Sequence, residues 1–265
     1  MRLLLGVFPV RRILLGLIVV LVLAVISGGI GSVYVSPDAF IKIIVGRFPF
    51  IDIAATWPSS WDTIIWDLRL PRIVLAGLVG SALAISGATY QGLFRNPLAD
   101  PYLIGVASGA GLGAAIIFLT GLPFYFGGFS LLPLAAFVGG IGAVTVAYVI
   151  ARQSDGVPMT TLILAGVAIS SMAGALTSLL MIQSDPDVRP LLGWLLGGFN
   201  GASWVDVKVL IIYIIPAIVV MIAYGRMLNL FQLSEDEAKQ LGVNVERSKV
   251  LLVALASLTT AAAVS

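Results

Sequence analysis

The chain has 265 residues, of which 59% are hydrophobic and only 11% are charged, and its mean hydropathy is +1.08. Soluble domains carry roughly 25% charged residues, so this composition excludes a soluble globule and indicates an integral membrane protein. The lack of histidine and cysteine excludes imidazole or thiolate metal sites, disulfides and catalysis by those side chains, and a net charge of +2 does not suggest nucleic-acid binding.

A helix needs about 20 mainly apolar residues to cross the hydrocarbon layer of a membrane. On this criterion the sequence predicts an all-α bundle of seven spans. Their approximate ranges are 13–30, 71–91, 101–120, 131–150, 158–182, 205–224 and a last one from about 250 onward. The first span could instead be a signal peptide, because Arg11 and Arg12 precede its apolar run. We prefer a helix, since the run is too long and no clear cleavage site follows.

Lysine and arginine residues in the loops predict the orientation of the chain. With the N-terminus in the cytoplasm, nine of the 15 basic residues lie on the cytoplasmic side and six lie on the outer side. We therefore expect a cytoplasmic N-terminus.

Three helix starts are predicted by a capping side chain followed by proline at the first helical position, namely Ser36-Pro37, Asp100-Pro101 and Asp185-Pro186. The third predicts a short outer helix through about Leu196, ended by Gly197-Gly198.

Every aspartate and glutamate lies in a loop or at the end of a predicted span, as Asp206 does at the start of 205–224. Ion-coupled carriers usually place ionisable groups in the membrane, so this placement counts against a secondary transporter. The chain also has no G-x-x-x-x-G-K-[ST] loop, so it lacks this device for binding ATP itself. If the protein transports a solute, the energy is expected to come from another subunit.

Small residues recur at the spacing of helix contacts. Gly105, Gly109 and Gly113 form a GxxxGxxxG stripe, for which we prefer tight helix packing over a sliding surface. On the span 158–182, small and hydroxyl-bearing residues gather near one face. Interhelical hydrogen bonding and the lining of a polar pathway explain these residues equally well; they are Ser170, Ser171, Gly174, Thr177 and Ser178.

The loop 226–249 is polar and holds a well-capped helix of its own. Ser234 and Glu237 form a capping box, and Gly242 supplies the stop. Asn244 can cap a second helix that leads into the last span. By pattern alone, the first helix is either a docking element for a soluble partner or a solvated connector.

Several motifs, in consistent order from about residue 36 to 265, resemble the permease subunits of ABC importers for iron–siderophore, haem and cobalamin (the FecCD-type, or type II, family). The resemblance is carried by RLPR (69–72), GSALAISG (80–87), Gln91, NPLADP (96–101), GVASGA (105–110), LAGVA (164–168), WLLGG (194–198) and the loop pattern Glu235-x-x-Ala238-x-x-x-Gly242.

The resemblance implies a permease subunit that forms the translocation pathway for a metal chelate in a bacterial or archaeal cell membrane. Family members form homodimers, usually with ten helices per subunit. Two copies of a cytoplasmic ATP-binding subunit bind beneath, and a periplasmic or lipid-anchored substrate-binding protein docks outside. The subunit itself has no catalytic residue, cofactor or metal. The runner-up function is a secondary transporter or channel that works without an ATPase.

The same resemblance assigns roles to residues. Arg69 and Arg72 match the arginines that receive carboxylates of the binding protein, although interfacial anchoring by snorkelling is the alternative. The contact with the ATPase is expected at Ser234, Glu235, Glu237, Ala238, Leu241 and Gly242. We expect one transmembrane domain over 1–265, incomplete at its C-terminus, with the cytoplasmic coupling loop 226–249 inside it.

Overall fold

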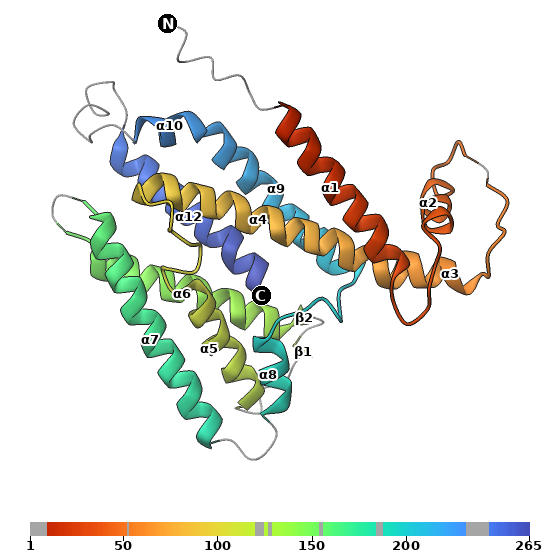
Figure 1. The fold of residues 1–265 in the computed structure, drawn as a ribbon. Coiled ribbons are helices and arrows are strands. Elements are labelled where there is room, and N and C mark those ends of the chain that lie inside the picture. The colour runs from red at the N-terminus through yellow and green to blue at the C-terminus, as the bar shows by residue number, and fades with distance from the viewer. Residues whose placement is uncertain are drawn as a thin grey trace, which may run out of the picture. The chain divides into compact units, whose positions relative to one another are not determined.

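The computed structural model describes residues 10–51, 53–119, 125–126, 129–153, 156–183, 188–231 and 244–265. Apart from a two-residue antiparallel hairpin, β1 (Tyr125–Phe126) with β2 (Phe129–Ser130), and one isolated bridge between Gln153 and Gly156, the regular structure of these residues is helical (Figure 1). The contacts divide the chain into two compact units. Unit 1 comprises Met1–Gly77 with Phe199–Val207, and unit 2 comprises Leu78–Gly198 with Lys208–Ser265.

Six described helices are long and apolar enough to cross a membrane. They are α1 (Val10–Gly29), the continuous helix Ser60–Phe94, α6 (Leu131–Ala151), α7 (Met159–Gln183), α9 (Trp204–Ala223) and α12 (Val245–Val264). These helices confirm six of the seven predicted spans, five of them within a few residues at each predicted boundary; the helix Ser60–Phe94 starts well before the predicted residue 71. The remaining apolar segment forms α5 (Val106–Leu119), which has only 14 residues.

In unit 1, α2 (Pro37–Val45) begins where the Ser36-Pro37 pair predicted. The Ser36 side chain accepts a hydrogen bond from the Ala39 amide at 3.3 Å, which satisfies one of the free amides of the first turn. The Phe40 ring then packs on α1 at Gly28, where a Cβ would lie only 2.1 Å from a ring carbon. The small core of this unit consists of Val35, Ala39, Phe40, Ile43 and Ile65.

The span predicted from residue 71 begins earlier, at Ser60. Helix α3 (Ser60–Thr63) continues into a π-helix, η1 (Ile64–Arg69), and then into α4 (Leu70–Phe94). The amide of Leu70 bonds to the carbonyl of Ile65, five residues back. Pro71 has no amide hydrogen and its ring crowds the preceding turn, so a widened turn lets the helix pass through the proline without ending.

The prediction that a helix begins at Asp100-Pro101 is wrong. The Asp100 carboxylate accepts a hydrogen bond from the Tyr102 amide at 2.7 Å and forms a local turn instead of a helix cap. Gly105 has a φ of +93°, a conformation that glycine adopts without strain. Helix α5 therefore starts only at Val106, which explains why this segment is too short to meet the length of a span.

In unit 2, α5, α6 and α7 pack together, and α12 packs on α5 and α6. The short helices α8 (Arg189–Leu195) and α10 (Gly225–Leu230) and most of α4 and α9 also belong to this unit. Helix α8 lies inside the predicted range and is followed by Gly197 and Gly198, both with positive φ; the predicted start at Asp185-Pro186 lies outside the described residues. The core contains Ile104, Ala147, Leu162, Leu252 and Ala256 among its fully buried members.

Glycines let α5 and α6 approach within backbone contact. A Cβ on Gly109 would lie 2.4 Å from the Gly139 carbonyl oxygen, and one on Gly113 would lie 2.1 Å from the Ala135 carbonyl oxygen. The prediction that Gly109 and Gly113 serve tight packing is therefore confirmed. Gly105 does not continue this contact, because it lies in the turn before α5.

Gly139→Ala is expected to lower the free energy of unfolding by about 1–3 kcal/mol, because the new methyl group meets the Gly109 backbone at 2.3 Å. Gly142→Ala on the same helix is the matched control. Among the described residues, no other segment comes within 4 Å of a Cβ at Gly142, so the better helix propensity of alanine should leave the protein unchanged or more stable. Thermal unfolding in detergent compares the two variants, and equal destabilisation would contradict close packing at Gly139.

Candidate functional site

Arg69, at the end of η1, binds the C-terminal end of α1. Its Nη1 donates hydrogen bonds to the carbonyls of Gly28 at 2.7 Å and Gly29 at 3.3 Å, and its Nη2 donates to the carbonyl of Val33. The last carbonyls of a helix lack partners within the helix and attract cations. Since α1 has no basic residue in its own last turn, Arg69 supplies that charge from a distant part of the sequence.

Arg72 lies one turn further on and has fewer bonds. Its Nη2 donates to the carbonyl of Asn200 at 2.7 Å, while its Nε is buried and has no hydrogen-bond partner among the described residues. The two arginines therefore lie on the same helical segment, but they hold different parts of unit 1. No hydrogen bond of the Arg72 Nη1 is seen within the described part of the chain.

Tryptophans surround this region of unit 1. The Trp204 indole donates to the carbonyl of Trp66 at 2.8 Å, and the two rings lie 5.4 Å apart at an angle of 41°. The Arg47 guanidinium lies 5.2 Å from the centre of the Trp66 ring, a cation–π arrangement. These contacts fix the helix that carries both Arg69 and Arg72.

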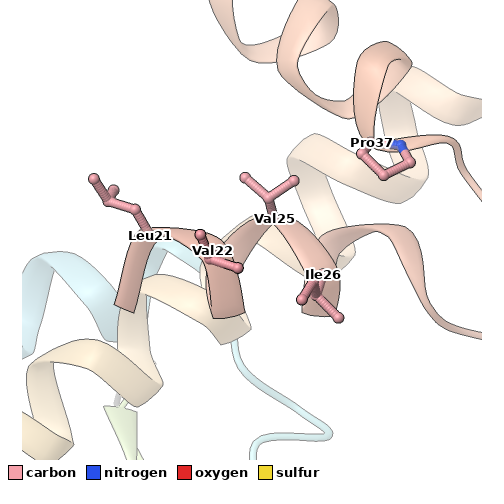
Figure 2. Close-up of a pocket in the computed structure, with 5 residues that line it drawn as sticks. All are labelled: Leu21, Val22, Val25, Ile26 and Pro37. Atoms are coloured by element: carbon pink, nitrogen blue, oxygen red, sulfur yellow. The ribbon is translucent and has the colours of Figure 1, made fainter. Parts of the chain in front are cut away.

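A shallow pocket in unit 1 lies between α1 and the first residue of α2 (Figure 2). It is lined by Leu21, Val22, Val25 and Ile26 of α1 and by Pro37. All five side chains are apolar, so this pocket offers neither a charge nor a hydrogen bond to a polar solute. It suits lipid contact along an exposed apolar helix.

The five residues considered for a polar pathway separate into two groups on α7. Ser171, Gly174 and Ser178 are exposed within the chain, whereas Thr177 is buried and Ser170 is half-buried. The hydroxyls of Ser171 and Thr177 donate to carbonyls of their own helix, Val167 at 3.0 Å and Ala173 at 2.9 Å. Both bonds lie within α7 and do not join it to a neighbouring helix. The exposed face with Ser171, Gly174 and Ser178 is therefore accessible to another molecule.

The residues predicted to contact an ATPase, from Ser234 to Gly242, lie outside the described residues. The segments on both sides are firmly placed in unit 2. Phe231 and Val245 are buried in its core, and the Asn244 side chain accepts a hydrogen bond from the Arg247 amide at 3.0 Å. The predicted cap of the following helix is thus confirmed, and α12 begins at Val245.

The connection between α4 and α5 contains a tight turn. The sequence analysis identified this segment only through its NPLADP motif (96–101), which resembles the family. The Asn96 side chain accepts a hydrogen bond from the Leu98 amide at 2.9 Å, and Arg95 has a φ of +50°. Burial, with the neighbouring Asp100 carboxylate, raises the pKa of Tyr102. No group of three or more metal-binding acidic side chains occurs among the described residues.

Comparison with known proteins identifies relatives over most of the chain. A model of the FecCD transport family matches residues 17–265. The chain is 42% identical to the cobalamin import system permease protein BtuC of Halobacterium salinarum, over 78% of this chain and 55% of that protein. It is 38% identical to the hemin transport system permease protein HmuU of Yersinia pestis, over 79% and 64% respectively.

Two further matches extend the comparison. The Fe(3+)-citrate import system permease protein YfmE of Bacillus subtilis is 34% identical over 92% of this chain and 69% of its own length. A solved metal-chelate type ABC transporter in an inward-facing conformation superposes with a TM-score of 0.77 at 30% identity, over 96% of this chain and 75% of that one. The chain spans 55% to 64% of the length of the cobalamin and hemin permeases. These relatives and the apolar helices identify a multi-pass membrane protein.

Arg69→Ala is expected to increase hydrogen exchange in residues 28–35, including the Val35 amide that bonds to the Gly29 carbonyl at 3.0 Å. A hydrogen bond from a charged group contributes about 1.5–3 kcal/mol to stability. Its loss should make these amides exchange at least roughly tenfold faster than in the parent protein. Arg72→Ala removes the same charge and should leave these amides unchanged, while exchange near Asn200 increases. Equal protection of residues 28–35 in both variants would contradict the capping role of Arg69.

Proposed function

Since the chain belongs to the FecCD transport family, we propose that it is the membrane permease subunit of an ATP-driven importer for a metal chelate. The family match over residues 17–265 carries this proposal. Relatives named for cobalamin, hemin and Fe(3+)-citrate import suggest a substrate that is a large chelate rather than a bare ion. The lack of histidine and cysteine agrees with a subunit that passes its cargo without ligating the metal.

The energy for import comes, in this proposal, from separate ATP-binding subunits. The sequence has no phosphate-binding loop of its own, and the described apolar helices carry acidic residues only near their ends. We propose a complex of two permease copies, two cytoplasmic ATP-binding subunits and a periplasmic or lipid-anchored substrate-binding protein. The complex lies in a bacterial or archaeal cell membrane, with the permease N-terminus in the cytoplasm.

The pathway is proposed to run along the exposed face of α7. Ser171, Gly174 and Ser178 lie on that face and offer small or hydroxyl-bearing side chains. Ser170 is next to the turn at Gly105, since its Oγ would lie 3.4 Å from a Cβ there, and Thr177 is buried. The latter two would therefore support the pathway wall more than they line it.

The loop from Ser234 to Gly242 is proposed as the coupling element. Both flanking segments are anchored in the core of unit 2 through Phe231 and Val245. A displacement of the loop by a bound ATPase would therefore act directly on α12.

Deletion of residues 235–241, or Gly242→Trp, is expected to reduce import to background while membrane insertion stays normal. Gly225→Ala is the matched control, because within the described part of the chain no other segment comes within 4 Å of a Cβ at that position. Uptake of labelled cyanocobalamin, hemin and ferric citrate is measured in cells that express the ATPase and binding protein. Normal uptake in the loop variants would exclude the coupling role. Uptake that persists without the ATPase would favour a secondary transporter.

Arg69 and Arg72 are proposed to receive carboxylates of the binding protein. The guanidinium of Arg72 donates one hydrogen bond and that of Arg69 donates three, which supports Arg72 as the main contact. Arg72→Glu is expected to weaken docking at least tenfold, because an attractive charge pair becomes a repulsive one. Arg69→Glu should weaken docking and also release residues 28–35. Lys208→Glu, an equal charge change at an exposed site, serves as control. Unchanged affinity of the Arg72 variant for the purified binding protein would return Arg72 to an anchoring role.

A further inference from the structure

Two pairs of buried hydroxyl groups join α4 to α12 inside unit 2. The Ser86 Oγ lies 2.6 Å from the Thr259 Oγ1, and the Tyr90 Oη lies 2.8 Å from the Ser257 Oγ. All four side chains are at most 1% exposed. We name these four residues the hydroxyl ladder. The pairs join positions more than 160 residues apart in the sequence.

The hydroxyls of α12 also have acceptors within their own helix. The Ser257 Oγ lies 2.6 Å from the Val253 carbonyl, and the Thr259 Oγ1 lies 2.9 Å from the Leu255 carbonyl and 3.0 Å from the Ala256 carbonyl. A hydroxyl has one proton to donate but can also accept, and either oxygen of each pair can donate the bond between the helices. The Tyr90 Oη can also donate to the Val253 carbonyl at 3.4 Å. Separating the two helices would break both buried hydroxyl pairs, which a protein interior disfavours.

The ladder lies on the helix that follows the proposed coupling element. Helix α12 begins at Val245, directly after the capping residue Asn244, and more than half of its residues are buried. A displacement of the coupling loop would therefore move α12, and the hydroxyl ladder joins that helix to α4 by hydrogen bonds. Packed side chains and hydrogen-bond networks of this kind can carry coupling between distant sites.

We infer that Ser86, Tyr90, Ser257 and Thr259 are positioning residues that make α4 and α12 move as one body during the transport cycle. This inference rests on the proposed function and adds the contact through which motion of the coupling loop reaches α4. A role in folding stability alone would make the ladder independent of nucleotide.

The lack of native cysteine allows two spin labels to be placed without background. Cysteines are introduced at Gln91 of α4 and Arg247 of α12, both exposed, and the full complex is reconstituted in nanodiscs. Distances are measured without nucleotide and after trapping with ATP and orthovanadate. In the otherwise unchanged protein the distance between the labels should stay constant. In Ser86→Ala/Tyr90→Phe it should shift on trapping, and the amount of chelate imported per ATP hydrolysed should fall about fivefold or more.

Two matched variants separate coupling from stability. Thr260 is equally buried, but its hydroxyl donates within α12 to the Ala256 carbonyl at 2.7 Å, so Thr260→Val should behave like the parent. The exchange Ser86→Thr/Thr259→Ser keeps a hydroxyl on both helices and should restore the import ratio. Tyr90→Phe alone loses one oxygen and no volume, so it tests the ladder if the double variant fails to fold.

A parent distance that changes on trapping would overturn the ladder as a rigid link. So would loss of import in Thr260→Val equal to that in the ladder variants. If the parent complex imports the chelate and the ladder variants import it equally well, the inferred role of the ladder is overturned and the proposed function is not. Parent complexes that show no ATP-dependent import would instead overturn the proposed function.

Discussion

The constraint behind most of these features is that hydrocarbon offers no water to an unpaired polar group. A helix that ends near or inside a membrane must find donors for its last carbonyls and acceptors for its first amides. Arg69 supplies donors to Gly28 and Gly29 at the end of α1, and Asn244 supplies an acceptor at the start of α12. The same constraint pairs the buried hydroxyls of Ser86 and Thr259.

The described helices have both tightly held contacts and an exposed face. Gly109 and Gly139 bring α5 and α6 into backbone contact, and the ladder bonds α4 to α12. The face of α7 that carries Ser171 and Ser178 is exposed in the described part of the chain. The proposed function requires both kinds of surface, because rigid groups of helices would move against one another across a less tightly held surface.

The long apolar runs could be predicted because length and hydropathy alone determine which segments can span, and six of seven segments meet that criterion. The helix caps at Ser36 and Asn244 could also be predicted from the sequence. The start of α5 was not, since Asp100 can cap a helix or close a turn with the same carboxylate, and the Gly105 backbone selects the turn. The helix from Ser60 that leads into α4 was missed, because a π-helix carries the chain up to Pro71, where a regular α-helix would be expected to begin.

By itself, the sequence determined that the chain is an all-α membrane protein, and its motifs identified the family, because composition and motif order are properties of the linear chain. The roles of single side chains depend on what lies beside them. The sequence predicted that Arg69 carries a positive charge near a membrane surface. Only the folded chain shows that its guanidinium binds the C-terminal end of α1. The hydroxyls of Ser86 and Thr259 are 173 positions apart, and no local pattern pairs them. Packing of α4 near α12 alone makes them partners.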